Sequence, residues 1–207
     1  MDTERPPAFF YEIFDASLPR LGPGDDASTQ RALDALLGAM SRGEGGAAGG
    51  ARNLIAGNSS AGVLLAGTAV NQVSGNLIGT DVSGAAALGN TVGVRLDGAS
   101  GNTIGGDAVA AGNTISGNFG PGIHAIGGSG GNVIGANRIG ATFSGEALGN
   151  GGDGVRVESY SDGNSIEGGN SIAFNGGAGV AVDASRDNDI LGNEIHDNAG
   201  GGIRHRA

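Results

Sequence analysis

A column of asparagines at regular spacing constrains the fold of this chain more than any other feature. Each member opens the same short phrase, Asn-x-Ile, and the members are Asn53, Asn76, Asn113, Asn137, Asn170 and Asn193. Neighbouring members are separated by 23, 37, 24, 33 and 23 residues. A unit of about 23 residues that is twice lengthened by insertion indicates a solenoid, in which each coil packs only on its neighbours.

Other positions recur inside each unit. In the short units a second Asn comes five residues after the first, and a Gly-Val or Gly-Ile pair follows it. A third Asn-x-hydrophobic phrase completes the coil, as in Asn71-Gln-Val and Asn132-Val-Ile. This order predicts three short strands per coil with Asn at the bends. Asn suits a bend because it tolerates left-handed backbone and its amide can bond to the equivalent Asn one coil away.

Alternation along each strand predicts which side chains face the interior. We expect two apolar columns inside, namely Ile55, Ile78, Ile115, Ile139, Ile172 and Ile195, and Val63, Val94, Ile123, Val155, Val180 and Ile203. Matching insertions at 80–89 and 141–149 lengthen the second and fourth coils. The chain therefore repeats a two-coil unit with a period of about 60 residues.

These motifs resemble the right-handed parallel β-helix repeats (PbH1 repeats) of pectin-lyase-like proteins, over residues 52–206. They are most similar to Asn- and Gly-rich repeats of large bacterial surface proteins, whose loops resemble Ile78-Gly-Thr-Asp81 and Ala87-Leu-Gly-Asn90. The resemblance implies an all-β fold, a right-handed parallel β-helix solenoid of about six coils at 52–207. It also implies an extracellular or cell-surface setting. This fold carries binding, structural and catalytic roles alike.

Residues 1–51 lie outside the repeat. Residues 27–40 have the pattern of an amphipathic helix, with Ser28 as N-cap. We expect 1–42 to contain a helix that caps the first coil, and 43–51 to be a Gly/Ala linker. Residues 7–29 resemble the head of SAM-dependent methyltransferases. No strand–loop–helix unit that could hold the cofactor follows, so we expect no methyltransferase activity.

Composition excludes several functions. The 45 glycines have no Gly-X-Y period and fall between short apolar runs, so they mark turns rather than collagen. The chain has no Cys, which removes disulfides and thiolate chemistry. A net charge of −10 argues against nucleic acid as a partner, and no apolar run is long enough to span a bilayer. The N-terminus shows no secretory signal pattern, so the localisation stays unknown.

The outward positions of the Gly-Val strands form the candidate binding surface. In order along the solenoid they are Leu64, Arg95, His124, Arg156, Ala181 and Arg204. The cations at 95, 124, 156 and 204 could bind an acidic polysaccharide, because Arg forks onto carboxylates. The two insertions could wall a groove past His124. The other interpretation is solvated cations that discourage edge pairing. We therefore predict a non-catalytic module that is either structural or in contact with an acidic polysaccharide.

Catalysis is the alternative interpretation. A polysaccharide lyase would use Arg156 and His124 as base and acid, with Asp153 and Glu158 as the nearest carboxylates. A glycoside hydrolase would need two facing carboxylates, and the candidates are Asp162, Asp187 and Asp189. The segment 151–155 resembles one Ca²⁺-binding nonapeptide repeat, but it occurs once, so we expect no cofactor and keep Ca²⁺ as an alternative.

Two further expectations concern the ends of the chain. Its last residues, including Ile203, are still part of the repeat. We therefore expect an open strand edge there and end-to-end self-association. A fused or truncated chain without a selected activity is the third interpretation.

Overall fold

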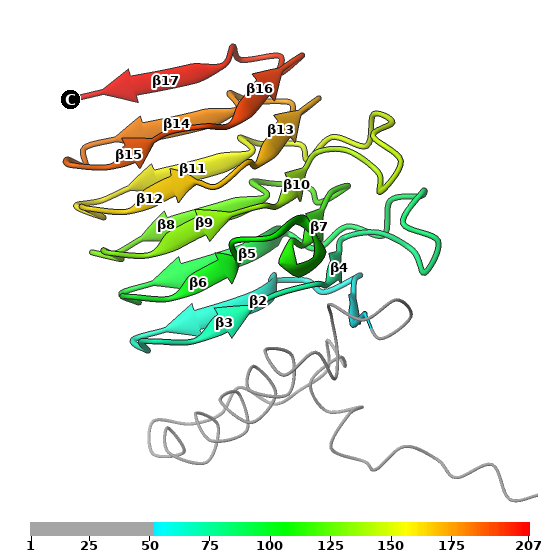
Figure 1. The fold of residues 1–207 in the computed structure, drawn as a ribbon, viewed down its shortest axis with the longest axis horizontal. Coiled ribbons are helices and arrows are strands. Elements are labelled where there is room, and N and C mark those ends of the chain that lie inside the picture. Colours follow the sequence, from blue (N-terminus) through cyan, green and yellow to red (C-terminus); the bar gives the residue numbers. More distant parts are fainter. Residues whose placement is uncertain (1–51) are drawn as a thin grey trace, which may run out of the picture.

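Figure 1 shows a computed structural model of the chain, in which residues 52–207 are described. They form three parallel sheets that run along one axis, and each complete coil adds one strand to each sheet. This arrangement confirms the predicted all-β parallel β-helix. The expected capping helix at 27–40, the linker at 43–51 and the methyltransferase-like stretch lie outside the described residues.

All paired strands are parallel and in register. The first sheet consists of β1 (Leu54–Ile55), β4 (Leu77–Ile78), β7 (Thr114–Ile115), β10 (Arg138–Ile139), β13 (Ser171–Ala173) and β16 (Glu194–His196). The second consists of β2 (Ala61–Ala66), β5 (Val92–Asp97), β8 (Ile123–Ile126), β11 (Val155–Glu158), β14 (Val180–Asp183) and β17 (Ile203–Arg206). The third consists of β3 (Gln72–Val73), β6 (Thr103–Gly105), β9 (Val133–Gly135), β12 (Ser165–Glu167) and β15 (Asp189–Ile190). A short 3-10 helix, η1 (Val109–Ala111), lies in the lengthened turn of the second coil.

The interior consists of apolar columns, one residue per coil. The predicted columns are buried from Ile55 to Ile172 in the first sheet and from Val63 to Val180 in the second. Ile195 is only partly buried. The prediction for Ile203 was wrong, since this side chain is 57% exposed. It lies on β17, the edge strand of the second sheet, where no described coil covers it.

Three ladders of asparagine side chains hold the bends between the strands. In each ladder the Nδ2 group of one Asn donates to the Oδ1 atom of the Asn on the next coil, at 2.8–3.1 Å. The first ladder is the column that the sequence displays. The second contains Asn58, Asn90, Asn118, Asn150, Asn175 and Asn198, and the third contains Asn71, Asn102, Asn132, Asn164 and Asn188. The expected bonds between equivalent asparagines are thereby confirmed.

Asn137 illustrates why the position accepts only this amide. Its Oδ1 atom accepts from the backbone N–H of Asn113 at 3.0 Å and from the Nδ2 group of Asn113 at 2.9 Å. Its Nδ2 group donates to the Ile104 carbonyl at 2.8 Å and to the Oδ1 atom of Asn170 at 3.1 Å. The side chain is 1% exposed. A carboxylate could not donate, and an apolar side chain would leave buried groups on three coils without partners.

We predict that Asn137→Ala lowers the free energy of unfolding by about 3 kcal/mol or more, because buried donors and acceptors are left unpaired. Urea denaturation measures this change. The matched control is Asn193→Ala, at the partly exposed end of the same ladder, where the structure gives two side-chain bonds. Equal losses in the two variants would contradict the account of the ladder.

Two glycines with the same backbone conformation have different surroundings. Gly140 has a φ of 92° and Gly145 a φ of 90°, both in the left-handed region that disfavours side chains. A Cβ atom on Gly140 would collide with the carbonyl oxygen of Ala173 and the side chain of Asn175, both on the next coil. A Cβ atom on Gly145, in the 141–149 loop, would meet nothing within 4 Å.

This pair separates backbone strain from coil spacing. Gly145→Ala should cost about 1 kcal/mol through strain alone. Gly140→Ala should cost at least about 2 kcal/mol more, because the coils cannot approach closely around the added methyl group. Thermal or urea unfolding of the two variants checks the difference, and a Gly145→Ala loss as large as that of Gly140→Ala would refute it.

The two insertions form loops that project beside β4 and β10 (Figure 1). Each closes with an antiparallel bridge, Thr80 with Ala87 and Ala141 with Ala147. The contacts of the second loop involve the first sheet, since Arg138 Nη1 donates to the Phe143 carbonyl at 2.7 Å. This loop therefore contacts the first sheet. No helix within residues 52–207 is both long and apolar enough to cross a membrane.

Candidate functional site

The outward column of the second sheet has the register that the sequence predicts. Arg95 pairs with Leu64 and His124, and Arg156 pairs with His124 and Ala181, which in turn pairs with Arg204. The four predicted binding residues therefore share one face of one sheet. The arrangement follows from strict repetition, because equivalent residues of successive coils lie about 4.8 Å apart.

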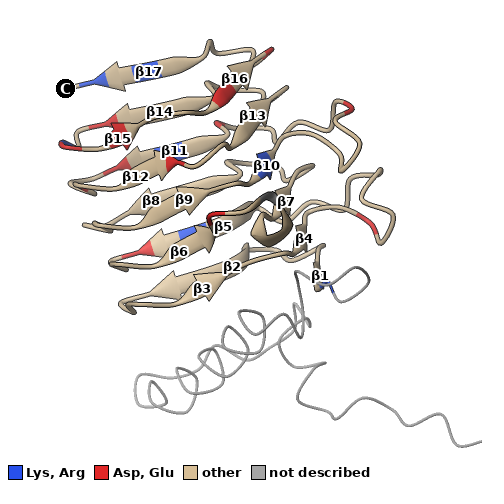
Figure 2. Cartoon of the chain, in the orientation of Figure 1, with Lys and Arg blue, Asp and Glu red and all other residues tan. Residues whose placement is uncertain are grey.

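Carboxylates accompany these cations on the same face. We define the charged cluster as the basic residues Arg95, His124, Arg156 and Arg204 together with the acidic residues Asp97, Asp153, Glu158 and Asp183. Figure 2 shows basic and acidic residues next to each other on β5 and β11. The three arginines of the cluster face four carboxylates, so the cluster is not a cationic surface.

Glu158 lies at the centre of the cluster and joins two coils. One of its carboxylate oxygens accepts from Nε of Arg156 at 2.8 Å and contacts Nη2 at 2.7 Å. The other lies 2.9 Å from Nε2 of His124 on the neighbouring strand β8. The His124 and Glu158 side chains are 14% and 21% exposed. Both oxygens of Glu158 are thus bound within the chain, at distances typical of charge-assisted hydrogen bonds.

Arg156 and Arg204 both contact the carboxylates of Asp153 and Asp183. Ala181 stands between the two arginines in the register and is buried. Nη2 of Arg204 lies 3.4 Å from both Asp153 and Asp183, and Arg156 lies 3.6 and 3.7 Å from the same two carboxylates. A longer side chain at 181 would occupy the space through which the guanidinium groups reach these acids.

Asp153 has a second bond that ties it to the fold. Its Oδ1 atom accepts from the backbone N–H of Ala178 on the next coil at 2.7 Å. The side chain is 6% exposed. The motif that resembles a Ca²⁺ repeat therefore directs its carboxylate at a backbone amide and two arginines. Within residues 52–207, no three His, Asp or Glu side chains are placed to share a metal ion.

The protonation equilibria of the cluster follow from these contacts. Burial raises the pKa of Glu158, but the hydrogen bonds from Arg156 and His124 and their charges outweigh burial, so the pKa lies below its ordinary value of 4.5. Burial lowers the pKa of Arg156, while the hydrogen bond and charge of Glu158 and the charges of Asp153 and Asp183 raise it more. Arg156 is thus held in its charged form, which disfavours it as a general base.

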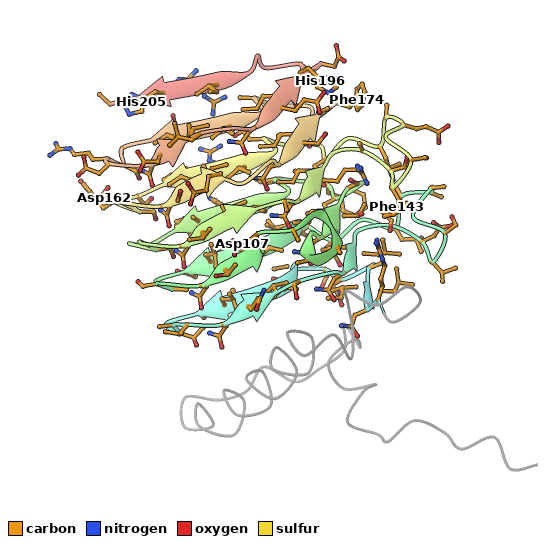
Figure 3. The ribbon with its side chains drawn as sticks, viewed as in Figure 1. Asp107, Phe143, Asp162, Phe174, His196 and His205 are labelled. Atoms are coloured by element: carbon orange, nitrogen blue, oxygen red, sulfur yellow. The ribbon has the colours of Figure 1, made fainter. Side chains whose placement is uncertain are left out.

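The remaining candidates contact groups other than Glu158 or lie exposed. Arg95 pairs with Asp97 on its own strand at 2.8 Å, and both side chains are well exposed. Asp162 accepts from the backbone N–H of Arg186 at 2.7 Å and so fixes a turn of the next coil. Asp189 lies exposed on β15. Figure 3 shows Asp162 on the side of the molecule opposite the loops.

The sequence prediction omitted Asp97 and Asp183, although a usable signal was present. Residues two apart on a strand share a face. Asp97 follows Arg95 by two positions, Glu158 follows Arg156 by two, and Asp183 follows Ala181 by two. The same alternation that identified the cations therefore identifies the acids that neutralise them.

Glu158→Gln should lower the free energy of unfolding at pH 7 by about 1 kcal/mol, because the ionised carboxylate binds Arg156 and lies within hydrogen-bond distance of His124. The folded chain holds the pKa of Glu158 below 4.5, so this stabilisation is full above that pH and is lost as the pH falls through the folded-state pKa. The difference between wild type and variant should shrink accordingly in urea denaturations at pH 7, 5 and about 3.5. The exposed residue Glu146 provides the control, Glu146→Gln, and a pH-independent loss for Glu158→Gln would contradict the assignment.

Comparison with known proteins agrees with this architecture. Residues 92–206 match the family described as right handed beta helix region, which covers more than half of the chain. Comparison with curated proteins and with solved structures gives no significant match. The matched segment contains most of the three stacked parallel sheets. The chain belongs to the right-handed β-helix family.

Proposed function

We propose that this β-helix is a non-catalytic structural module, in which the charged cluster fastens coils to one another. One observation carries the proposal. Each arginine of the cluster lies within salt-bridge distance of at least one carboxylate of its own chain, with closest contacts of 2.8 Å for Arg95, 2.7 Å for Arg156 and 3.4 Å for Arg204. Glu158 and Asp153 each join neighbouring coils. Such bonds support the stacking of coils and occupy the groups that a ligand would need.

Contact with an acidic polysaccharide is the second candidate. It is favoured by the exposure of the arginine side chains, 38% for Arg95 and 35% for Arg156. A ligand carboxylate would have to replace Asp97 or Glu158 as the partner of these groups. That exchange yields little net free energy, because one charge-assisted hydrogen bond is traded for another.

The two candidates, and the lyase alternative, are separated by one panel of acidic polysaccharides such as polygalacturonate, alginate and hyaluronan. The panel is assayed for ultraviolet absorbance of unsaturated products, with and without Ca²⁺, and for binding. We expect no turnover and no binding that Arg156→Gln weakens. Binding that this variant removes while the fold stays intact would establish the polysaccharide contact, and turnover would overturn the non-catalytic proposal.

A matched pair of variants tests the structural role directly. Arg156→Gln should destabilise the chain more than Arg95→Gln, since Arg156 contacts three carboxylates and Arg95 contacts one. The expected difference is about 1 kcal/mol in urea denaturation. Equal stabilities would remove the reason to assign a structural role to the cluster.

A further inference from the structure

A polar hollow lies on the outer side of the first sheet, away from the charged cluster. Its volume is about 210 Å³. Four neighbouring strands, β7, β10, β13 and β16, each contribute one side chain. These side chains occupy the same register position on successive coils. The side chains that matter are Thr114, Arg138, Ser171 and Glu194 from the strands, with Arg52 and Phe143 beside them.

Two guanidinium groups meet on one aromatic ring at this hollow. The Cζ atom of Arg52 lies 4.6 Å from the centroid of the Phe143 ring, and that of Arg138 lies 5.5 Å from it. Both distances are within the range of cation–π attraction. Arg138 also donates to the Phe143 carbonyl at 2.7 Å, which fixes its position against the 141–149 loop. Figure 3 shows Phe143 on the side of the molecule where the loops leave the first sheet.

These two arginines differ from those of the charged cluster. Within residues 52–207, neither Arg52 nor Arg138 lies within salt-bridge distance of a carboxylate, whereas Arg95, Arg156 and Arg204 all do. Figure 2 shows β10, which carries Arg138, as a basic segment apart from the mixed charges of the second sheet. Glu194, at the far end of the hollow, is 75% exposed and its nearest ionic partner is His196 at 3.7 Å.

The Phe143 ring holds the two positive charges in place without neutralising them. A cation–π contact orients a guanidinium over a ring but leaves its net charge and its remaining N–H donors available. Like charges near one site repel, and an anion between them removes that repulsion. Arg also presents its donors as a planar fork that matches a planar or tetrahedral oxyanion.

We propose that this hollow is a binding site for a small molecule that carries an oxyanion, either a carboxylate or a sulfate. Arg138 and Arg52 bind the oxyanion, and the Ser171 hydroxyl lies in the lining beside it. The volume is below the range of drug-sized ligand pockets, so the ligand is a small molecule or a single unit of a chain. The site is independent of the charged cluster and of the structural role proposed for it.

The test is a titration of the full ¹⁵N-labelled chain, followed by NMR, with sodium sulfate, sodium glucuronate and neutral glucose at constant ionic strength. We expect saturable shifts with one or both anions and none with glucose, confined to residues 112–114, 136–143, 169–171 and 194. Tighter binding of sulfate or of glucuronate identifies the oxyanion. Absence of saturable shifts at these residues with both anions overturns the proposal.

Variants assign the effect to the arginines. Arg138→Gln should weaken anion binding at least about tenfold, because charged hydrogen bonds are lost. Arg52→Gln should also weaken anion binding. This residue precedes the first strand, so the variant replaces Arg138→Gln in the test if Arg138→Gln folds poorly. Arg186→Gln, at an exposed arginine that belongs to neither candidate surface, is the matched control and should leave the affinity unchanged. Unchanged affinity in the first two variants, or an equal loss in the control, overturns the assignment.

Discussion

The buried asparagine amide is the interaction on which the rest of this structure depends. An amide both donates and accepts, so a column of identical amides can satisfy itself from coil to coil while also binding the backbone at each bend. In the interior such a column is stable only when every member has its partners, because an unpaired buried polar group is costly. The ladder therefore enforces the register: a slip of one residue in any coil would leave amides unpaired on both sides of it.

Fixed register determines what the surface can present. Once equivalent residues lie one above another, each outward position becomes a column whose chemistry is read off the sequence coil by coil. On the second sheet the column brings Arg156 beside Glu158, His124 and Asp183, and these side chains form ion pairs within the chain. On the first sheet the corresponding column places Arg138 between Thr114 and Ser171, which do not neutralise it. Both sheets consist of parallel strands in register, so the contrast in surface chemistry comes from their side chains.

The repeat made the architecture predictable, while contacts between coils were harder to foresee. Strand number, core columns such as Ile55 to Ile172 and the outward register of Arg95, His124 and Arg156 all follow from spacing. The prediction for Ile203 failed because the core column was extended into β17, the edge strand of the second sheet, although the repeat also predicted an open edge there. Asp97 and Asp183 were within reach of the alternation rule. The contact of Arg52 and Arg138 with Phe143 was not, because it joins an irregular loop to residues of other coils, and the conformation of a loop is not set by the repeat.

Native-state hydrogen exchange of the backbone amides is the most direct measurement of the central claim. The backbone N–H groups of ladder residues such as Asn76, Asn113 and Asn118 donate to Asn side chains one coil away. If the ladders couple the coils, these amides exchange as slowly as those of the buried strands, with one shared opening free energy along the central coils. Ladder amides that exchange orders of magnitude faster than those of Ile115 or Ile139 would contradict it, and would show that apolar stacking alone holds the solenoid together.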